Sequence, residues 1–124
     1  MKRAILGALC CALLLKLFFF DFVRAEGRSM IPAIKNGQML IVNKISYGLR
    51  LPLGGYLARW AEPKEGDVVV FWTPYGDLAV KRCSKSVDKG GFFASGDNCE
   101  ASFDSRAYGP VSTNNIVGKV AGIK

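Results

Sequence analysis

The sequence predicts an all-β protein, a small barrel or sandwich, preceded by one N-terminal apolar helix. Residues 1–23 are largely apolar, whereas the rest of the chain consists of short apolar runs broken by Gly, Pro and Asn. Beyond residue 25 no stretch shows a convincing 3.6-residue period, and short, closely spaced strands are typical of a barrel or sandwich. We therefore divide the chain into an N-terminal segment at 4–23 and a β domain at 24–124.

The N-terminal segment is expected to be a transmembrane anchor. A helix over residues 4–23 would be about 30 Å long, enough to cross the hydrocarbon core of a bilayer. Lys16 lies past the midpoint of this segment, so its amine can extend toward the membrane surface. Lys2 and Arg3 favour a cytoplasmic N-terminus. The chain would then be a single-pass protein of the cytoplasmic membrane with an extracytoplasmic β domain.

A removed signal peptide is the alternative interpretation of this segment. It has a basic start, an apolar run and the small-x-small sequence Val23-Arg24-Ala25. Lys16 and Asp21 are charged and precede this possible cleavage site, which argues against removal of the segment. Both interpretations send the β domain across the membrane.

The strands are expected where apolar runs are bounded by turn residues. The runs at 67–73 and 78–84 flank the turn sequence Pro-Tyr-Gly-Asp and should pair as a hairpin. Further strands are expected at 38–45, 91–95 and 115–123.

The stretch 47–63 fits no strand well. It either dips into the membrane interface, where Trp, Tyr and Arg are favoured, or covers one end of the barrel. Its large side chains are Leu49, Leu51, Leu53, Tyr56, Leu57 and Trp60.

The net charge of +7 suits an anionic membrane surface or a nucleic acid. The basic residues are scattered, however, and only Lys-Arg-Cys-Ser-Lys at 81–85 resembles a cluster. We therefore expect a solvated basic surface, a lipid bilayer as a partner and no nucleic acid.

The absence of histidine limits the chemistry available to this chain. It excludes a Ser-His-Asp triad, a Cys-His pair and an H-E-x-x-H zinc site. No metal and no cofactor are expected, because the cysteines lack metal-ligand spacing and no glycine-rich phosphate loop follows a strand. What remains is a serine or threonine nucleophile with a lysine base.

A lysine serves as a base only when its amine is neutral near pH 7. Lowering its pKa by about three units requires about 4 kcal/mol in favour of the neutral form, which burial among apolar groups can supply. Lys81 meets this condition, because it follows Leu-Ala-Val in an apolar strand. Lys44, at the end of another strand, is the second choice. From position alone, a lysine such as Lys81 is more often an edge residue with a solvated amine.

Four segments, taken together, resemble the type I signal peptidases, which are membrane-anchored serine proteases with a Ser/Lys dyad. They are Gly-Arg-Ser-Met-Ile-Pro-Ala-Ile at 27–34, Gly-Asp-Val-Val-Val-Phe at 66–71, Val-Lys-Arg at 80–82 and Gly-Asp-Asn-Cys-Glu-Ala-Ser-Phe-Asp-Ser-Arg-Ala-Tyr-Gly-Pro-Val at 96–111. Their order and approximate spacing match that family, and the likeness covers nearly the whole chain.

The resemblance implies a role for particular residues. Ser29 matches the nucleophile, with its backbone N–H as an oxyanion donor, and Lys81 matches the general base. Ser102 matches a serine that orients the lysine. Residues that brace the site by polar contacts are matched by Asp97, Asp104 and Arg106. The position two before the nucleophile, which carries a hydroxyl in some members, is Gly27 here.

The implied substrates are exported preproteins with signal peptides. Small residues at positions −1 and −3 would fit shallow apolar pockets, and the extended substrate backbone would pair with strand edges beside Ser29 and Lys81. The residues expected to contact the substrate are Gly27, Arg28, Met30, Leu78, Ala79 and Val80.

Cys83 and Cys99 would face an oxidising compartment and are expected to form a disulfide. The alternative is a pair of free thiols.

Two other functions remain open on the sequence. One keeps the chemistry but serves a dedicated client, for instance a conjugation pilin. The other is a non-catalytic, membrane-tethered β module that binds a partner such as anionic lipid.

Overall fold

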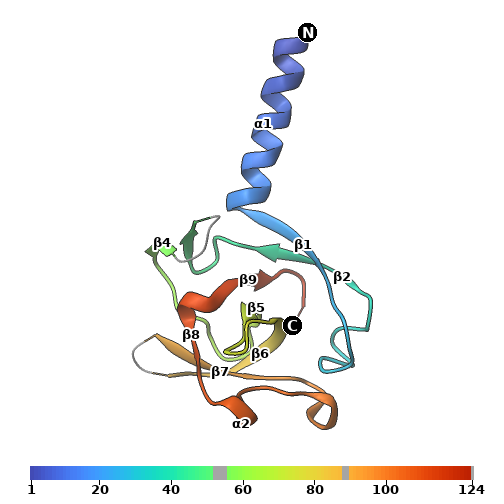
Figure 1. The fold of residues 1–124 in the computed structure, drawn as a ribbon, viewed down its shortest axis with the longest axis vertical. Helices are drawn as coiled ribbons and strands as arrows, with labels where there is room; N and C mark the ends of the chain where they lie inside the picture. The colour runs from blue at the N-terminus through green and yellow to red at the C-terminus, as the bar shows by residue number, and fades with distance from the viewer. Residues whose placement is uncertain (52–55, 88–89, 124) are drawn as a thin grey trace.

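The computed structural model describes residues 1–51, 56–87 and 90–123, as a helix that leads into a β domain (Figure 1). The helix, α1, spans Lys2–Phe18. The strands are β1 (Phe20–Arg24), β2 (Met39–Asn43), β3 (Gly48–Arg50), β4 (Tyr56–Arg59), β5 (Val68–Trp72), β6 (Leu78–Val87), β7 (Gly91–Ser95), β8 (Val111–Ser112) and β9 (Ile116–Val120). Short helical turns are η1 (Cys99–Ala101), α2 (Ser105–Tyr108) and η2 (Thr113–Asn115).

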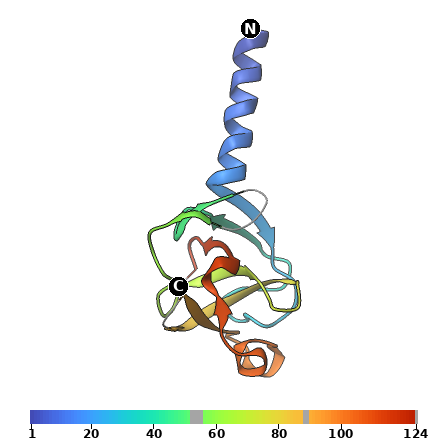
Figure 2. The same ribbon diagram turned by 60° about the vertical axis from the view of Figure 1, so that its left-hand side comes forward.

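The main sheet has the strand order β1-β2-β9-β5-β6-β7-β8, and β3 pairs with β4 in a separate hairpin. The main sheet curls on itself, as the two views in Figures 1 and 2 show. The prediction of an all-β domain is confirmed. The expected hairpin is also confirmed, because β5 and β6 pair antiparallel with Val70 opposite Val80.

The central strand β5 is buried on both of its faces. Its side chains alternate between two apolar clusters, as the period of two in a strand requires. Val68 and Val70 belong to the first cluster, with residues such as Met30. Val69 and Phe71 belong to the second cluster. Packed side chains therefore lie on both faces of β5. The segments that carry Ser29 and Lys81 are joined to this curled sheet.

The N-terminal helix is shorter than expected. The helix was predicted to continue to Val23, and this is wrong: it ends at Phe18, and the next residues form β1, which pairs with β2 from Phe20 opposite Asn43 to Arg24 opposite Met39. The aromatic and β-branched residues here suit a strand, and ladder pairing outweighs helix continuation. Within the described residues, no helix has both the length and the apolar character needed to cross a membrane.

The stretch 47–63 was expected to lack strands, and this is wrong, since it contains the β3–β4 hairpin. Arg50 and Tyr56 both donate hydrogen bonds to the carbonyl of Ile116, at 2.9 and 2.7 Å, which ties the hairpin to β9. Leu57 and Trp60 are exposed. Leu53, which was included in the expectation, lies outside the described residues.

The expected disulfide is wrong, because both cysteines are free thiols. Cys83 pairs with Ala94 across the β6–β7 ladder and points into the second apolar cluster. Cys99 is exposed at the start of η1. Burial raises the pKa of the Cys83 thiol to about 11, which keeps it protonated and unreactive at neutral pH.

Candidate active site

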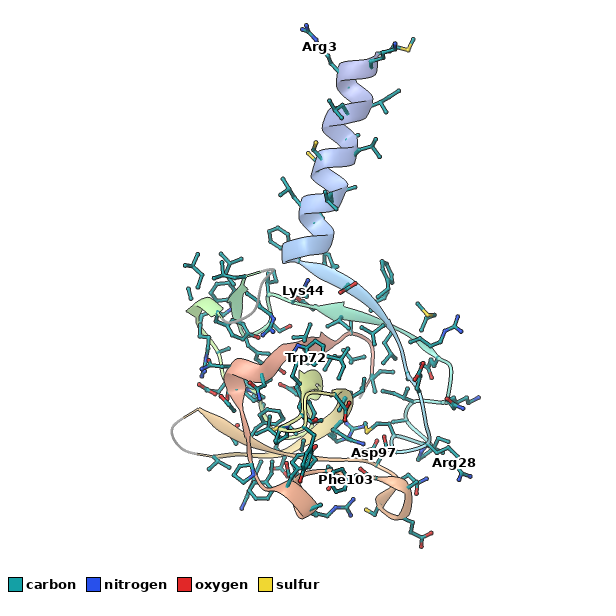
Figure 3. All side chains as sticks on the ribbon, viewed as in Figure 1. Arg3, Arg28, Lys44, Trp72, Asp97 and Phe103 are labelled. Carbon is teal, nitrogen blue, oxygen red and sulfur yellow. The ribbon has the colours of Figure 1, made fainter. Side chains whose placement is uncertain are left out.

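Ser29 and Lys81 line one cavity of about 380 Å³. The cavity lies between the end of β1 with the loop after it and the first four residues of β6. Lys44, the second choice of base, is not among the lining residues and lies near the α1–β1 junction in Figure 3. The lining residues are Val23, Arg24, Ala25, Glu26, Gly27, Ser29, Met30, Ile34, Leu78, Ala79, Val80 and Lys81.

The turn that carries Ser29 is held from two sides. The next residue, Met30, is buried in the first apolar cluster, and its Sδ accepts a hydrogen bond from the Asp97 N–H at 3.4 Å. The Ser29 carbonyl accepts from the Asn98 N–H at 2.8 Å, and the Asn98 side-chain amide donates to the Arg28 carbonyl at 3.0 Å. Both the core and the 96–98 turn therefore fix the position of Ser29.

Lys81 is only 7% exposed. Burial lowers the pKa of its amine; the nearby Asp104 carboxylate opposes this shift and the Arg106 guanidinium adds to it. Within the described part of the chain, no carboxylate forms an ion pair with Lys81. A buried amine without a counter-ion is driven toward its neutral form, which is the form a base requires.

The buried Asp104 carboxylate is satisfied by other donors. Arg106 binds it through two nitrogens at 2.9 and 2.7 Å, the Ser102 hydroxyl donates at 2.6 Å, and the Gly96 N–H donates at 2.8 Å. Burial raises the pKa of Asp104, but these hydrogen bonds outweigh it and hold the pKa well below the usual range. The Ser102 hydroxyl, which was expected to orient Lys81, donates to Asp104 in the structure, and the orienting role stays a prediction.

A second set of hydrogen bonds that stabilises the site is made by Arg82, the residue after Lys81 in β6. Arg82 donates to both carboxylate oxygens of Asp97 at 2.8 Å each and to the Gly66 carbonyl at 2.9 Å. Asp97 was expected to make polar contacts that stabilise the site, and in the structure its partner is Arg82. The partner itself was not expected, although Arg82 stands next to Lys81 in the Val-Lys-Arg motif.

Gly96 lies where the Ser29 turn and Ser102 approach the backbone closely. A Cβ placed on Gly96 would lie 2.3 Å from the Ser102 Oγ and 2.6 Å from the Ser29 carbonyl oxygen. Real Cβ atoms do not approach other atoms so closely, so only glycine fits without movement. Neither Gly96 nor Asn98 was identified as a site residue from the sequence, although both lie in the family-like segment 96–111.

Five of the six expected substrate-contact residues line the cavity; Arg28 does not. The Arg28 side chain is exposed and lies at the outer edge of the domain in Figure 3. Among the described residues, no group of three or more Cys, Asp or Glu side chains could hold a metal ion.

A curled β sheet that carries a serine and a buried lysine on one cavity is the arrangement of a candidate hydrolase, and comparisons with known proteins specify the class. The profile of the family described as signal peptidase, peptidase S26, matches residues 1–84 and 76–123. Signal peptidase I of Bacillus caldolyticus is 31% identical over 153 aligned positions, which cover 91% of this chain and 84% of that protein.

Two further relatives differ in how much of their length is matched. Signal peptidase I V of Bacillus subtilis (strain 168) is 44% identical over 144 positions, covering 83% of this chain and 84% of that protein. Signal peptidase I of Pseudomonas fluorescens is 33% identical over 73 positions, covering 58% of this chain but only 26% of that protein. The chain belongs to the signal peptidase family, peptidase S26, and is a serine endopeptidase.

We expect Gly96→Ala to impair peptide cleavage. The added methyl must push the Ser29 turn and Ser102 apart, and a displacement of about 1 Å at a reacting group can lower the rate about 100-fold. The measurement is kcat/KM on a model signal-peptide substrate. Gly91→Ala, at the start of the preceding strand β7, is the control, because its added Cβ would meet only ordinary contacts at 3.5 and 3.7 Å. Equal activity of the two variants would contradict this role for Gly96.

Proposed function

We propose that this protein removes signal peptides from exported preproteins, using Ser29 as the nucleophile and neutral Lys81 as the general base. The single observation that carries the proposal is that both residues line one cavity, where Lys81 is buried and has no carboxylate ion pair among the described residues. Relatives named Signal peptidase I support the choice of substrate.

The proposed reaction has two steps. Neutral Lys81 takes the proton of the Ser29 hydroxyl as Oγ attacks the scissile carbonyl, and the protonated Lys81 then gives that proton to the departing amine. The resulting acyl-enzyme is hydrolysed by a water molecule that Lys81 deprotonates.

The oxyanion that forms during this reaction needs hydrogen-bond donors. The Ser29 N–H donates to no acceptor within the described residues, so it is available for this purpose. The N–H of Gly27 is not, because it donates to the Asn36 side chain at 3.0 Å. Since each donor contributes about 3 kcal/mol to such barriers, a single donor would leave the reaction slower than two would.

The substrate backbone is proposed to enter between two strand edges. β1 is the terminal strand of the main sheet, and residues 78–81 of β6 pair with β5 on one side but precede the pairing with β7 on the other. An extended peptide can add to such edges. Apolar side chains that include Met30, Ile34 and Val80 then surround the cavity that would receive the small residues at −1 and −3.

We further propose that the chain attaches to the cytoplasmic membrane, with the β domain on its extracytoplasmic side. The side chains of α1 that the structure describes are exposed, and Leu6, Leu9 and Leu13 are each more than half accessible. The β1–β2 pair continues this apolar surface, because Phe22 and Ile41 stand opposite each other and are both exposed. An exposed apolar surface of this kind is typical of a membrane contact.

Replacing either member of the dyad should abolish cleavage. Ser29→Ala removes the nucleophile and Lys81→Met removes the base at similar size, so kcat/KM should fall by about 10⁴-fold or more in each. Cleavage of a purified preprotein, followed by gel and mass spectrometry, is the measurement. Ser84→Ala and Lys85→Met serve as matched controls, because both positions are exposed on β6, the strand of Lys81. The proposal fails if Ser29→Ala or Lys81→Met cleaves as fast as its control.

The pH dependence of kcat/KM should report the pKa of Lys81. Activity should rise with pH as the amine loses its proton, with a midpoint below the ordinary lysine value of 10.5. Arg106→Gln removes a positive charge that lowers this pKa, so the rising limb should move to higher pH. Arg106→Lys keeps the charge and should leave the limb in place. A limb that stays fixed in Arg106→Gln would show that another group titrates.

The proposed membrane contact can be tested separately from peptide cleavage. The double variant Phe22→Asp/Ile41→Asp should lower kcat/KM severalfold on a preprotein bound to vesicles, because two carboxylates oppose contact with lipid. Its activity on a soluble peptide is the internal control and should be unchanged. Equal losses on both substrates would indicate damage to the fold, and no loss on either would exclude the β1–β2 surface from the contact.

A further inference from the structure

Another cavity, of about 300 Å³, lies where the end of β2 pairs with β9. We call it the β2–β9 pocket. Its polar residues are Asn43, Ser46 and Lys119, and residues 120–123 form the rest of its wall. None of these residues lines the cavity of Ser29 and Lys81. The proposed peptide cleavage therefore gives the β2–β9 pocket no role.

The β2–β9 pocket lies at the end of the domain that joins α1. Asn43 stands opposite Phe20, the first residue of β1, in the β1–β2 ladder. The N–H of the next residue, Lys44, donates to the carbonyl of Phe19 at 2.8 Å, and Phe19 directly follows α1. Figure 3 shows Lys44 at this junction. With α1 in contact with the membrane as proposed, the pocket lies near the level of the lipid headgroups.

Exposed aromatic side chains stand beside the residues of the pocket. Phe19 and Phe20, at the junction with α1, are both exposed. The indole N–H of Trp60 donates to the carbonyl of Ile45, the residue before Ser46, at 3.1 Å, and the Trp60 side chain is exposed. Trp is enriched at the boundary between membrane and water. A polar pocket beside exposed rings fits a lipid headgroup better than a free ion in water.

The polar groups of the pocket are hydrogen-bond donors. The Asn43 Oδ1 accepts from the Ile45 N–H at 3.0 Å, which leaves the Asn43 amide nitrogen to donate. The Ser46 hydroxyl has no hydrogen-bond partner within the described part of the chain. The Lys119 amine lies 3.4 Å from the Asp67 Oδ1 and has further N–H groups to donate, since an ammonium carries three. These groups can converge on one acceptor-rich ligand.

The charges near the pocket favour a monoanion. Lys119 and Lys44 supply two positive charges, and Asp67 offsets one of them. Asp21 is the carboxylate of β1, but side chains alternate along a strand, so Asp21 faces away from Phe20 and from the pocket. A phosphodiester carries a single negative charge, and its oxygens accept hydrogen bonds from amines, amides and hydroxyl groups.

We propose that the β2–β9 pocket binds the phosphate of an anionic phospholipid, through the Lys119 amine, the Ser46 hydroxyl and the Asn43 amide. This inference rests on the proposed membrane attachment and does not depend on the proposed chemistry of Ser29 and Lys81. A lipid bound in this pocket holds the β domain to the membrane surface at a second point besides α1.

The test uses the full chain in micelles of dodecyl maltoside, a detergent without phosphate. Three probes are titrated in turn: dihexanoyl phosphatidylglycerol, dihexanoylglycerol and inorganic phosphate. The side-chain amide signal of Asn43 in a nitrogen–proton NMR spectrum reports occupancy. Phosphatidylglycerol should shift this signal to saturation, and dihexanoylglycerol should not shift it. Inorganic phosphate should bind at least about tenfold more weakly, because it makes no apolar contact with the exposed rings.

Asn43→Asp is the decisive variant. Asp keeps an oxygen for the Ile45 N–H but replaces the donating amide nitrogen with a charged oxygen. The affinity for phosphatidylglycerol, followed through the backbone signal of Ser46, should therefore fall about tenfold or more. Asn36→Asp is the matched control, because the Asn36 Oδ1 likewise accepts a backbone N–H, from Gly27 at 3.0 Å, at an exposed position outside the pocket. Its affinity should equal that of the intact chain.

Lys119 provides a second comparison. Lys119→Gln removes the amine and should weaken binding of phosphatidylglycerol about tenfold, whereas Lys119→Arg keeps the charge and the donors and should bind within about threefold of the intact chain. Lys35→Gln removes the same charge from an exposed position outside the pocket and should leave the affinity unchanged.

Three results would overturn the site. One is a lack of any saturable shift with phosphatidylglycerol, and the second is an Asn43→Asp chain that binds as tightly as Asn36→Asp. The third is equal affinity for inorganic phosphate or for dihexanoylglycerol, which would remove the lipid or the phosphate from the assignment. The membrane attachment itself stands in each case if Phe22→Asp/Ile41→Asp still loses activity only on vesicle-bound preprotein.

Discussion

The site depends on keeping one amine in the interior without a carboxylate partner. Asp104 is the carboxylate that could neutralise Lys81, and its charge raises the lysine pKa. Its two oxygens are instead occupied by Arg106, Ser102 and the Gly96 N–H. A carboxylate whose oxygens both accept hydrogen bonds is satisfied where it stands, so it gains little by turning toward the amine. Burial therefore remains the largest influence on Lys81, and its pKa falls.

The same cluster also positions Ser29, the proposed nucleophile. Gly96 donates to Asp104 while its missing side chain leaves room for the Ser29 carbonyl and for Ser102. The next two residues donate their N–H groups to the Met30 sulfur and the Ser29 carbonyl. One short turn thus contacts both Asp104, whose charge acts on Lys81, and the backbone of Ser29. Ser29 and Lys81 come from segments far apart in sequence, and this turn couples their positions.

Features set by local pattern could be predicted from the sequence. The hairpin of β5 and β6 is marked by two apolar runs around a turn, and the placement of Lys81 within an apolar strand is enough to suggest a buried amine. The end of α1 could not be predicted, because Phe20, Phe22 and Val23 also suit the end of an apolar helix and only pairing with β2 makes them a strand. The prediction of a disulfide was wrong for a related reason. The β6–β7 register points Cys83 into the core, and the sequence spacing of the cysteines does not reveal that register. The pairing of Arg82 with Asp97 and the close approach at Gly96 likewise depend on tertiary geometry.

The direction in which the pKa of Lys81 shifts distinguishes a catalytic interpretation of this residue from a structural one. Because the folded chain binds this proton more weakly than the unfolded chain, Lys81 makes stability rise with pH between its lowered pKa and the ordinary value of 10.5. Below that window the protonated amine opposes folding. A lysine that stabilises a fold through an ion pair has a raised pKa and the reverse dependence. Lys81 therefore lowers stability at neutral pH where an apolar side chain would not, and the base role that we propose for Lys81 accounts for this cost.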